Sequence, residues 1–197
     1  MKPLFTRMLL LTFLAGGAMA QNSDLAILFG ANGPTSGTVG NGVVSGQFGL
    51  AFQANFAEQL RETVAGQLYV ELPLMIAGHV SSTISHGITN EVKDSIYFTP
   101  GVRWRFTPQK RISFYAAGGA GFGSFGTSLN YVGGGTVSNT GSRDWTFAFG
   151  FGGGIDLRLT RLLSLRAEGR DFVTPSNEGG TRDRNHAFFM AGIGFHF

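Results

Sequence analysis

Hydrophobic residues alternate with small or polar ones along most of this chain. The clearest stretch is "DWTFAFGFGGGIDLRL" at 144–159, in which Trp145, Phe147, Phe149 and Phe151 fall at every second position and the opposite face is small, glycine-rich and charged. Successive side chains of a strand point to opposite sides of the sheet, so a period of two predicts an extended strand with one apolar face. This stretch is much longer than the five or six residues that are typical of globular strands.

The same period recurs often enough to predict eight strands. We expect them at 24–31, 43–56, 64–80, 95–106, 111–123, 144–159, 163–170 and 187–197. The connections at 57–62, 107–110 and 160–161 are short, whereas those at 32–42, 81–93, 130–143 and 174–185 are long and rich in Gly, Ser, Thr and Asn. An even strand number with short turns at one end and long loops at the other is typical of a transmembrane β-barrel.

Two kinds of barrel compete for this pattern. In a soluble lipocalin-like barrel the apolar faces point inward around a ligand, whereas in a membrane barrel they point outward to lipid. Lipid is favoured because the apolar faces carry aromatic residues near both ends of the strands, and because the opposite faces set charges of both signs among glycines. The aromatic residues are Phe56, Trp104, Phe106 and Phe197 near the short turns, and Phe122 and Trp145 near the long loops. We therefore predict an all-β fold, an eight-stranded antiparallel transmembrane β-barrel.

Two prolines conflict with an unbroken ladder. Pro73 and Pro100 fall inside predicted strands, and proline has no N–H to donate. We expect local bulges to accommodate them on two neighbouring strands.

Composition narrows the alternatives further. Charged residues make up 14% of the chain, against about 25% in ordinary soluble domains. The formal charge of +3 comes without a Lys/Arg cluster longer than pairs such as Lys110-Arg111, which argues against a nucleic-acid partner. With no cysteine there is no disulfide, thiolate nucleophile or Cys-ligated zinc.

The first twenty residues predict a cleavable signal peptide. Lys2 and Arg7 give a positive start, Met8 to Leu14 form a short apolar core, and "AMA" ending at Ala20 is a small-residue cleavage site. The expected organisation is a signal peptide at 1–20 and a barrel domain at 21–197.

A family resemblance rests on three stretches: "FFMAGIGFHF" at the C-terminus, "TPGVRWRFTP" at 99–108 and "SLRAEGRDF" at 164–172. They resemble the small eight-stranded outer-membrane β-barrels, the group of the OmpA transmembrane domain and OmpX. The resemblance implies a Gram-negative-type outer-membrane location with both termini in the periplasm. It also implies contact with outer-membrane lipid and lipopolysaccharide, and a C-terminal signal read by the barrel-insertion machinery. That signal would consist of Phe189, Ile193, Phe195 and Phe197. The peptidoglycan-binding half of OmpA-type proteins has no counterpart in the chain.

The predicted inward faces carry charges of both signs. They are Glu71, Asp156 and Glu168 against Arg103, Arg105, Arg158, Arg166 and Arg170. Side chains nearly fill the interior of an eight-stranded barrel, and buried charges must be paired, so one hypothesis is a salt-bridge network that plugs the lumen. The other is a small pore, which the excess of arginine would bias towards anions and for which the many inward glycines would leave room.

Little in the sequence predicts chemistry. Outer-membrane enzymes that modify lipid A use Ser and His, and the candidates here are Ser85-His86 and His186. Neither shows the nucleophile, base and orienting group in one arrangement, so we predict no catalytic residue. The four histidines lack metal-ligand spacing, and the glycine runs at 133–135 and 152–154 match no phosphate-binding loop. We expect neither a metal nor a cofactor.

The remaining class is interaction. Loops on a rigid scaffold often carry recognition, so the four long connections could bind a surface or envelope protein. Arg182, Asp183 and Arg184 give the last loop a charged tip that could touch lipopolysaccharide phosphates, or could simply be solvated. We predict a structural or surface-interaction barrel, with the small pore and then the lipid A-modifying enzyme as alternatives.

Overall fold

The computed structural model describes residues 23–32, 37–39, 42–44, 49–84, 88–108, 110–133, 136–175 and 185–197. The signal peptide expected at 1–20 lies outside these residues. The strands are β1 (Ser23–Asn32), β2 (Gly37–Val39), β3 (Gly42–Val44), β4 (Leu50–Thr63), β5 (Gly66–Ile84), β6 (Ile88–Phe98), β7 (Gly101–Arg105), β8 (Ile112–Gly133), β9 (Thr136–Arg158), β10 (Leu163–Val173) and β11 (Asn185–His196). No helix long and apolar enough to cross a membrane occurs in this described part.

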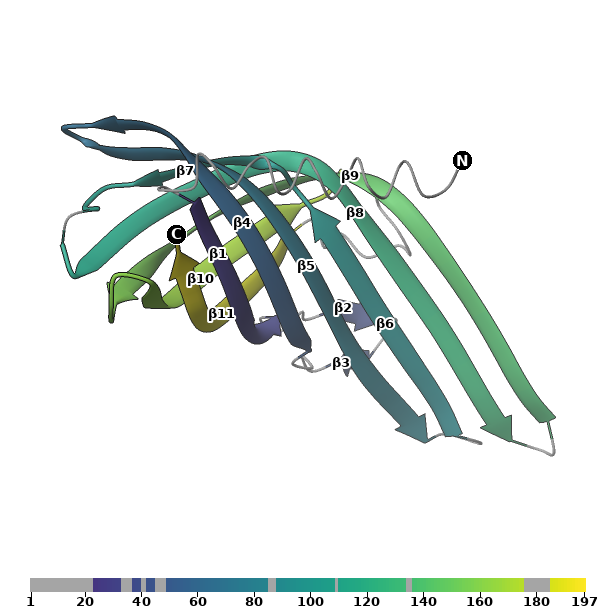
Figure 1. Ribbon diagram of the computed structural model, residues 1–197. Helices are drawn as coiled ribbons and strands as arrows, with labels where there is room; N and C mark the ends of the chain where they lie inside the picture. Colours follow the sequence, from purple (N-terminus) through teal and green to yellow (C-terminus); the bar gives the residue numbers. More distant parts are fainter. Residues whose placement is uncertain are drawn as a thin grey trace, which may run out of the picture.

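The strands close into an eight-stranded antiparallel barrel, as the sequence predicts. One sheet runs in the order β4-β1-β11-β10-β9-β8-β6-β5-β7, and the additional pairings β4–β5 and β8–β7 join its ends. β6 and β7 occupy successive parts of one barrel position between β5 and β8, so the nine strands fill eight positions. In Figure 1 the short turns lie at the left end of the barrel. β2 and β3 form a separate hairpin.

The two prolines meet at the gap between β6 and β7. Leu74 pairs with Phe98 and Glu71 pairs with Gly101, so Leu72 and Pro73 of β5 have no ladder partners at Thr99 and Pro100. The register is the same on both sides of the gap. The expected bulges were therefore wrong: both prolines lie at one interruption of the ladder, between β6 and β7, and the register does not shift there.

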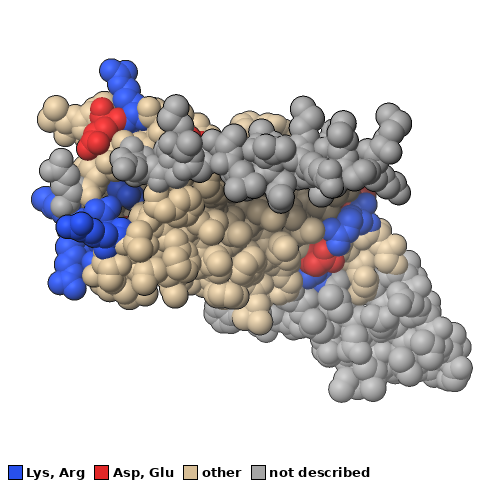
Figure 2. Space-filling view, viewed as in Figure 1, with Lys and Arg blue, Asp and Glu red and all other residues tan. Residues whose placement is uncertain are grey.

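The faces point as a membrane barrel requires. Large apolar residues are exposed on the outside of the barrel, among them Ile27, Phe56, Leu72, Ile76, Val102, Phe114, Phe149, Ile155, Leu165 and Ile193. Eight charged residues of the barrel strands are buried inside: Asp24, Glu71, Arg103, Arg105, Asp156, Arg166, Glu168 and Arg170. On the face that Figure 2 shows, a band without charged side chains separates a basic left end from a mixed patch on the right. An apolar belt of this extent excludes the lipocalin-like alternative, because a soluble barrel would turn it inward.

Four strands continue well past the rest of the barrel. β5 pairs with β6 as far as Ile84 and Ile88, and β8 pairs with β9 as far as Gly133 and Thr136. These extensions run to the lower right in Figure 1. Two connections expected as loops, 81–93 and 130–143, are therefore largely strand.

The boundary between β4 and β5 also differs from expectation. Residues 57–62, expected as a turn, belong to β4, and its hairpin with β5 turns tightly before Gly66, where φ is 145°. Glycine accepts this conformation without a steric penalty.

Candidate functional site

A layer of paired charges fills the interior nearer the short turns. It consists of four carboxylates and four arginines, none more than 3% exposed: Asp24, Glu71, Asp156, Glu168, Arg103, Arg105, Arg166 and Arg170. They come from β1, β5, β7, β9 and β10. We call this set the ionic layer. Equal numbers of the two signs make its formal charge zero.

Asp24 lies at the centre of one half of the ionic layer. Its Oδ2 lies 2.7 Å from Arg166 Nη2 and 3.0 Å from Arg105 Nη2. The same two arginines reach Asp156: Arg166 Nε lies 2.7 Å from Oδ1, and Arg105 Nη2 lies 2.9 Å from Oδ2. Each carboxylate is thus shared by two arginines, which offsets the cost of removing all four groups from water.

The other half is built around Arg170. Its Nη2 lies 2.7 Å from Glu71 Oε1 and its Nε lies 2.7 Å from Glu168 Oε1. The two carboxylates also accept hydrogen bonds from neutral donors. Asn55 Nδ2 donates to Glu71 at 3.0 Å, and the Tyr115 hydroxyl donates to Glu168 at 2.6 Å. Tyr115 can lie there because Gly154 is opposite it; a Cβ at that position would overlap the tyrosine hydroxyl.

Arg103 joins the two halves. Its Nη2 lies 3.2 Å from Asp24 Oδ1, and its Nε lies 3.7 Å from Glu71 Oε2. The guanidinium also lies over the rings of Tyr69 and Tyr115, at 5.2 and 5.4 Å from their centroids. None of its nitrogens has a hydrogen-bond partner among the described residues. Arg103 is therefore held by charge and by ring faces rather than by directed hydrogen bonds.

Nearer the long connections the interior is aromatic. Tyr97 stacks on Phe172 with ring centroids 4.3 Å apart, and Phe188 meets both rings edge-on at 5.9 Å. Phe125 completes the group on the far side of Tyr97. Leu28, Met75 and Met190 are buried with these rings. We call the four rings and these three residues the aromatic layer.

One inward glycine gives its space to these rings. A Cβ at Gly150 would lie 3.0 Å from the Phe172 ring, so the glycine makes room for that ring. The sequence-based expectation that inward glycines leave space for a pore therefore fails at Gly150, because the Phe172 ring occupies that space.

The structure changes the predicted set of lumen charges at two positions. Asp24 was missed, although it shares the inward face of the first strand with Ala26 and Leu28, both fully buried. Arg158 was included, but it is only half-buried at the short-turn end and forms no ion pair among the described residues. With Asp24 added and Arg158 removed, the expected excess of arginine disappears. The other seven predicted lumen residues are brought together.

Three side chains, Ser164, His196 and Asp24, are arranged in the order of a catalytic triad. His196 Nε2 lies 3.0 Å from Ser164 Oγ, and His196 Nδ1 lies 3.4 Å from Asp24 Oδ2. A nucleophile must be reachable by its substrate, yet Ser164 is fully buried and Asp24 is shared among three arginines. These contacts connect β10, β11 and β1 at the place where the first and last strands of the barrel pair.

The residues weighed for chemistry fall elsewhere. Ser85 and His86 lie outside the described residues, as do Arg182, Asp183 and Arg184. The His186 ring packs 5.4 Å from the Phe125 ring. Within the described ranges, no three His, Asp or Glu side chains are grouped so that they could hold a metal ion.

The proposed C-terminal signal residues lie on the lipid-facing side. Phe189, Ile193, Phe195 and Phe197 are all exposed on or just after β11. Phe197 and Ser23 exchange two backbone hydrogen bonds, at 2.7 and 3.0 Å, which closes the barrel at the chain ends. Recognition of these residues by the insertion machinery stays a prediction.

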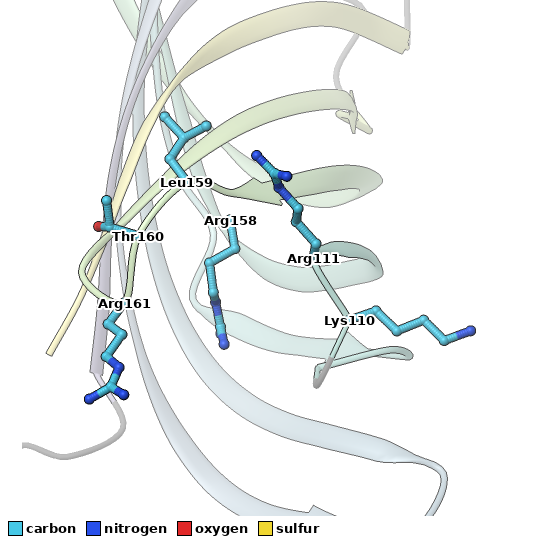
Figure 3. A pocket seen from close by; sticks show the side chains of 6 residues that line it. All are labelled: Lys110, Arg111, Arg158, Leu159, Thr160 and Arg161. Carbon is cyan, nitrogen blue, oxygen red and sulfur yellow. The ribbon is translucent and has the colours of Figure 1, made fainter.

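A second charged feature lies at the short-turn rim. A hollow of about 300 Å³ is lined by Lys110, Arg111, Arg158, Leu159, Thr160 and Arg161. The first two come from the β7–β8 turn, Arg158 ends β9, and the other three lie in the β9–β10 connection. Figure 3 shows Arg158 between the two turns.

No protein-family model matches this sequence, and no curated protein matches it significantly. Solved structures do match. Ail, the attachment invasion locus protein of Yersinia pestis, solved in complex with the heparin analogue sucrose octasulfate, has a TM-score of 0.60 at 12% identity, over 91% of this chain and 100% of its own. OprG from Pseudomonas aeruginosa has a TM-score of 0.51 at 12% identity, over 90% and 96% of the two chains. Neisserial surface protein A has a TM-score of 0.50 at 11% identity, over 90% and 98%. At such identities the matches show architecture alone, and with the closed sheet they give one conclusion: this chain has the fold of the small eight-stranded outer-membrane β-barrels.

Proposed function

We propose that this protein is an outer-membrane barrel with a closed lumen that binds other proteins through the protruding wall of β5, β6, β8 and β9. The observation that carries the proposal is the extension of these four strands past their neighbours, which leaves two long strand edges without a partner among the described strands. The apolar belt and the fold support the location. Short turns face the periplasm in barrels of this kind, so the wall would project from the cell.

The first open edge belongs to β5. β4 pairs with β5 only from Leu50 opposite Gly78, so the β5 segment from His79 to Ile84 has β6 on one side and no described strand on the other. The second belongs to β9. β10 reaches β9 only at Phe149, so Thr136–Ala148 pairs with β8 and with no other described strand.

Open edges can bind an extended segment of another protein. Each presents a row of N–H and C=O groups that would otherwise pair with water, and an added strand satisfies them. A monomeric barrel could avoid this exposure by ending all strands at the same height. Ail, which has the highest TM-score of the three similar structures above, is named for attachment, and that name is consistent with a surface-binding role here.

The two interior layers support a closed lumen. The ionic layer is charge-balanced, and the aromatic layer packs above it, so an ion crossing the barrel would have to disrupt both. We therefore place the pore below the interaction role. Catalysis ranks lower, because the one triad-like arrangement buries its hydroxyl.

The test is to shorten the β8–β9 hairpin. Replacing residues 129–140 with Asn-Gly joins Ser128 to Gly141, which already pair, through a favoured two-residue turn. Cells that display this variant should lose most of their attachment to an epithelial monolayer. A heat-shift gel of the purified variant should still show a folded barrel.

The matched control removes a different segment on the same side. Replacing the β2–β3 hairpin, Gly37–Val44, with a short Gly-Ser link should leave attachment unchanged. Equal attachment by wild type and the shortened β8–β9 variant, with both barrels folded, would refute the role proposed for the wall.

A further inference from the structure

We propose that the hollow at the short-turn rim binds the phosphate group of an anionic phospholipid. This inference goes beyond the binding role of the wall and rests only on the proposed membrane location. It concerns the opposite end of the barrel.

Four cationic side chains line this hollow: Lys110, Arg111, Arg158 and Arg161. No carboxylate of the described residues forms an ion pair with any of them. The four carboxylates that are buried among the described residues are already shared by the arginines of the ionic layer. Like charges around one hollow repel each other, and a bound anion relieves that repulsion. Arginine is well suited to the task, because its planar donors match phosphate oxygens.

The turns that hold these cations are well ordered by their own hydrogen bonds. Leu159 and Thr160 both donate backbone N–H groups to Leu163, and the Thr160 hydroxyl accepts from the N–H of Leu162 and Leu163. In the β7–β8 turn, Ser113 Oγ donates to the Thr107 carbonyl at 2.8 Å.

The two turns are also joined to each other. Arg158 N donates to the Arg111 carbonyl at 2.8 Å, so the two arginines come from backbone positions in direct contact. The cations are thus presented from a fixed frame, which reduces the entropy lost when a ligand binds.

The surroundings favour a lipid over a free phosphate. Leu159 lines the hollow together with the cations and is exposed. Ile112 and Leu162 are exposed beside it in the chain segments that form the two turns. The site therefore adjoins the end of the apolar belt, where acyl chains begin and head groups meet water. Figure 2 shows basic side chains gathered at this end. An amphiphile with a phosphate head and an apolar tail matches both parts, and basic clusters beside a membrane attract such lipids.

The test counts bound lipid. Purified, folded protein in a neutral detergent receives equal amounts of phosphatidylglycerol and phosphatidylcholine with the same acyl chains, and native mass spectrometry measures the lipid retained. The wild type should retain phosphatidylglycerol preferentially. Arg158→Gln should weaken that retention about 5-fold, the effect expected for one basic residue at a membrane surface.

The matched control is Arg61→Gln. Arg61 is exposed on β4 near the β4–β5 turn, so it lies at the same end but outside the hollow, and its removal changes the net charge equally. This variant should retain phosphatidylglycerol as the wild type does. Equal losses in both variants would mean attraction to overall charge and would overturn the site, as would unchanged retention by Arg158→Gln.

A second arm separates the two sources of phosphate. Inorganic phosphate at the concentration of the lipid should fail to displace phosphatidylglycerol, because it lacks the apolar part. Full displacement would overturn the lipid assignment in favour of a soluble phosphate compound. A heat-shift gel and insertion into vesicles are scored separately, so failure of the membrane location itself would be recognised.

Discussion

The ionic layer and the aromatic layer fill the same barrel with opposite chemistry. Both are built from inward positions of the same strands: β10 contributes Arg166 to one and Phe172 to the other. In the ionic layer each group depends on a particular partner of opposite sign. In the aromatic layer the rings depend on volume and shape. The difference teaches that the interior can be closed by either chemistry, but that the two should respond to substitution very differently.

Removing one arginine should have the largest effect. Arg166→Met would leave Asp24 and Asp156 short of their shared partner, and breaking a buried charge set typically costs about 3–5 kcal/mol. We expect a loss of that order in the free energy of unfolding, measured by urea titration in phospholipid vesicles. Arg158→Met is the matched control, since this inward-side arginine has no ion pair among the described residues, and should change stability by less than about 0.5 kcal/mol. Similar losses for both variants would break the distinction.

A conservative change in the aromatic layer should cost less. Phe172→Leu keeps an apolar side chain against Tyr97 and Phe188, so the expected loss is about 1–2 kcal/mol from reduced contact and a small void. The same urea titration measures it. A loss as large as that of Arg166→Met would mean that the rings are as demanding as the charges.

Opening either layer alone should have the smallest effect, on conductance. Folded wild-type protein in a planar bilayer should show no steady channel, and neither should Arg103→Ala nor Phe172→Ala, because the other layer still closes the lumen. A steady, anion-selective current through the wild type would revive the pore. A current in only one variant would show that a single layer forms the seal.

Much of the fold could be predicted from period and turn chemistry. The alternation in 144–159 located β9 and its two faces, and the terminal alternation located β11. Strand ends were harder, because polar residues at 81–93 and 130–143 have the composition of loops while the structure continues them as paired strands. Polar residues are compatible both with a solvated loop and with a four-stranded extension in water, so composition does not separate the two.

The candidate site was only partly predictable for a different reason. Arg103, Arg105, Arg166 and Arg170 stand out at inward positions of clear strands. Asp24 lies in a short first strand with weak alternation, and it pairs with Arg166, 142 positions away in the sequence. No local pattern carries information about such a partner. The rim hollow was equally hidden, because Lys110-Arg111 and Arg158 belong to separate turns.

The sequence by itself determined which face of each strand meets lipid and which faces inward, because a period of two acts within a few residues and depends only on the geometry of the extended chain. Only the tertiary structure decided which inward groups become partners. Closing the sheet sets the stagger of every strand, and that stagger brings Asp24 between three arginines, leaves Arg158 at the rim and places both prolines at one gap. These are relations across the barrel, and they exist only once it has closed.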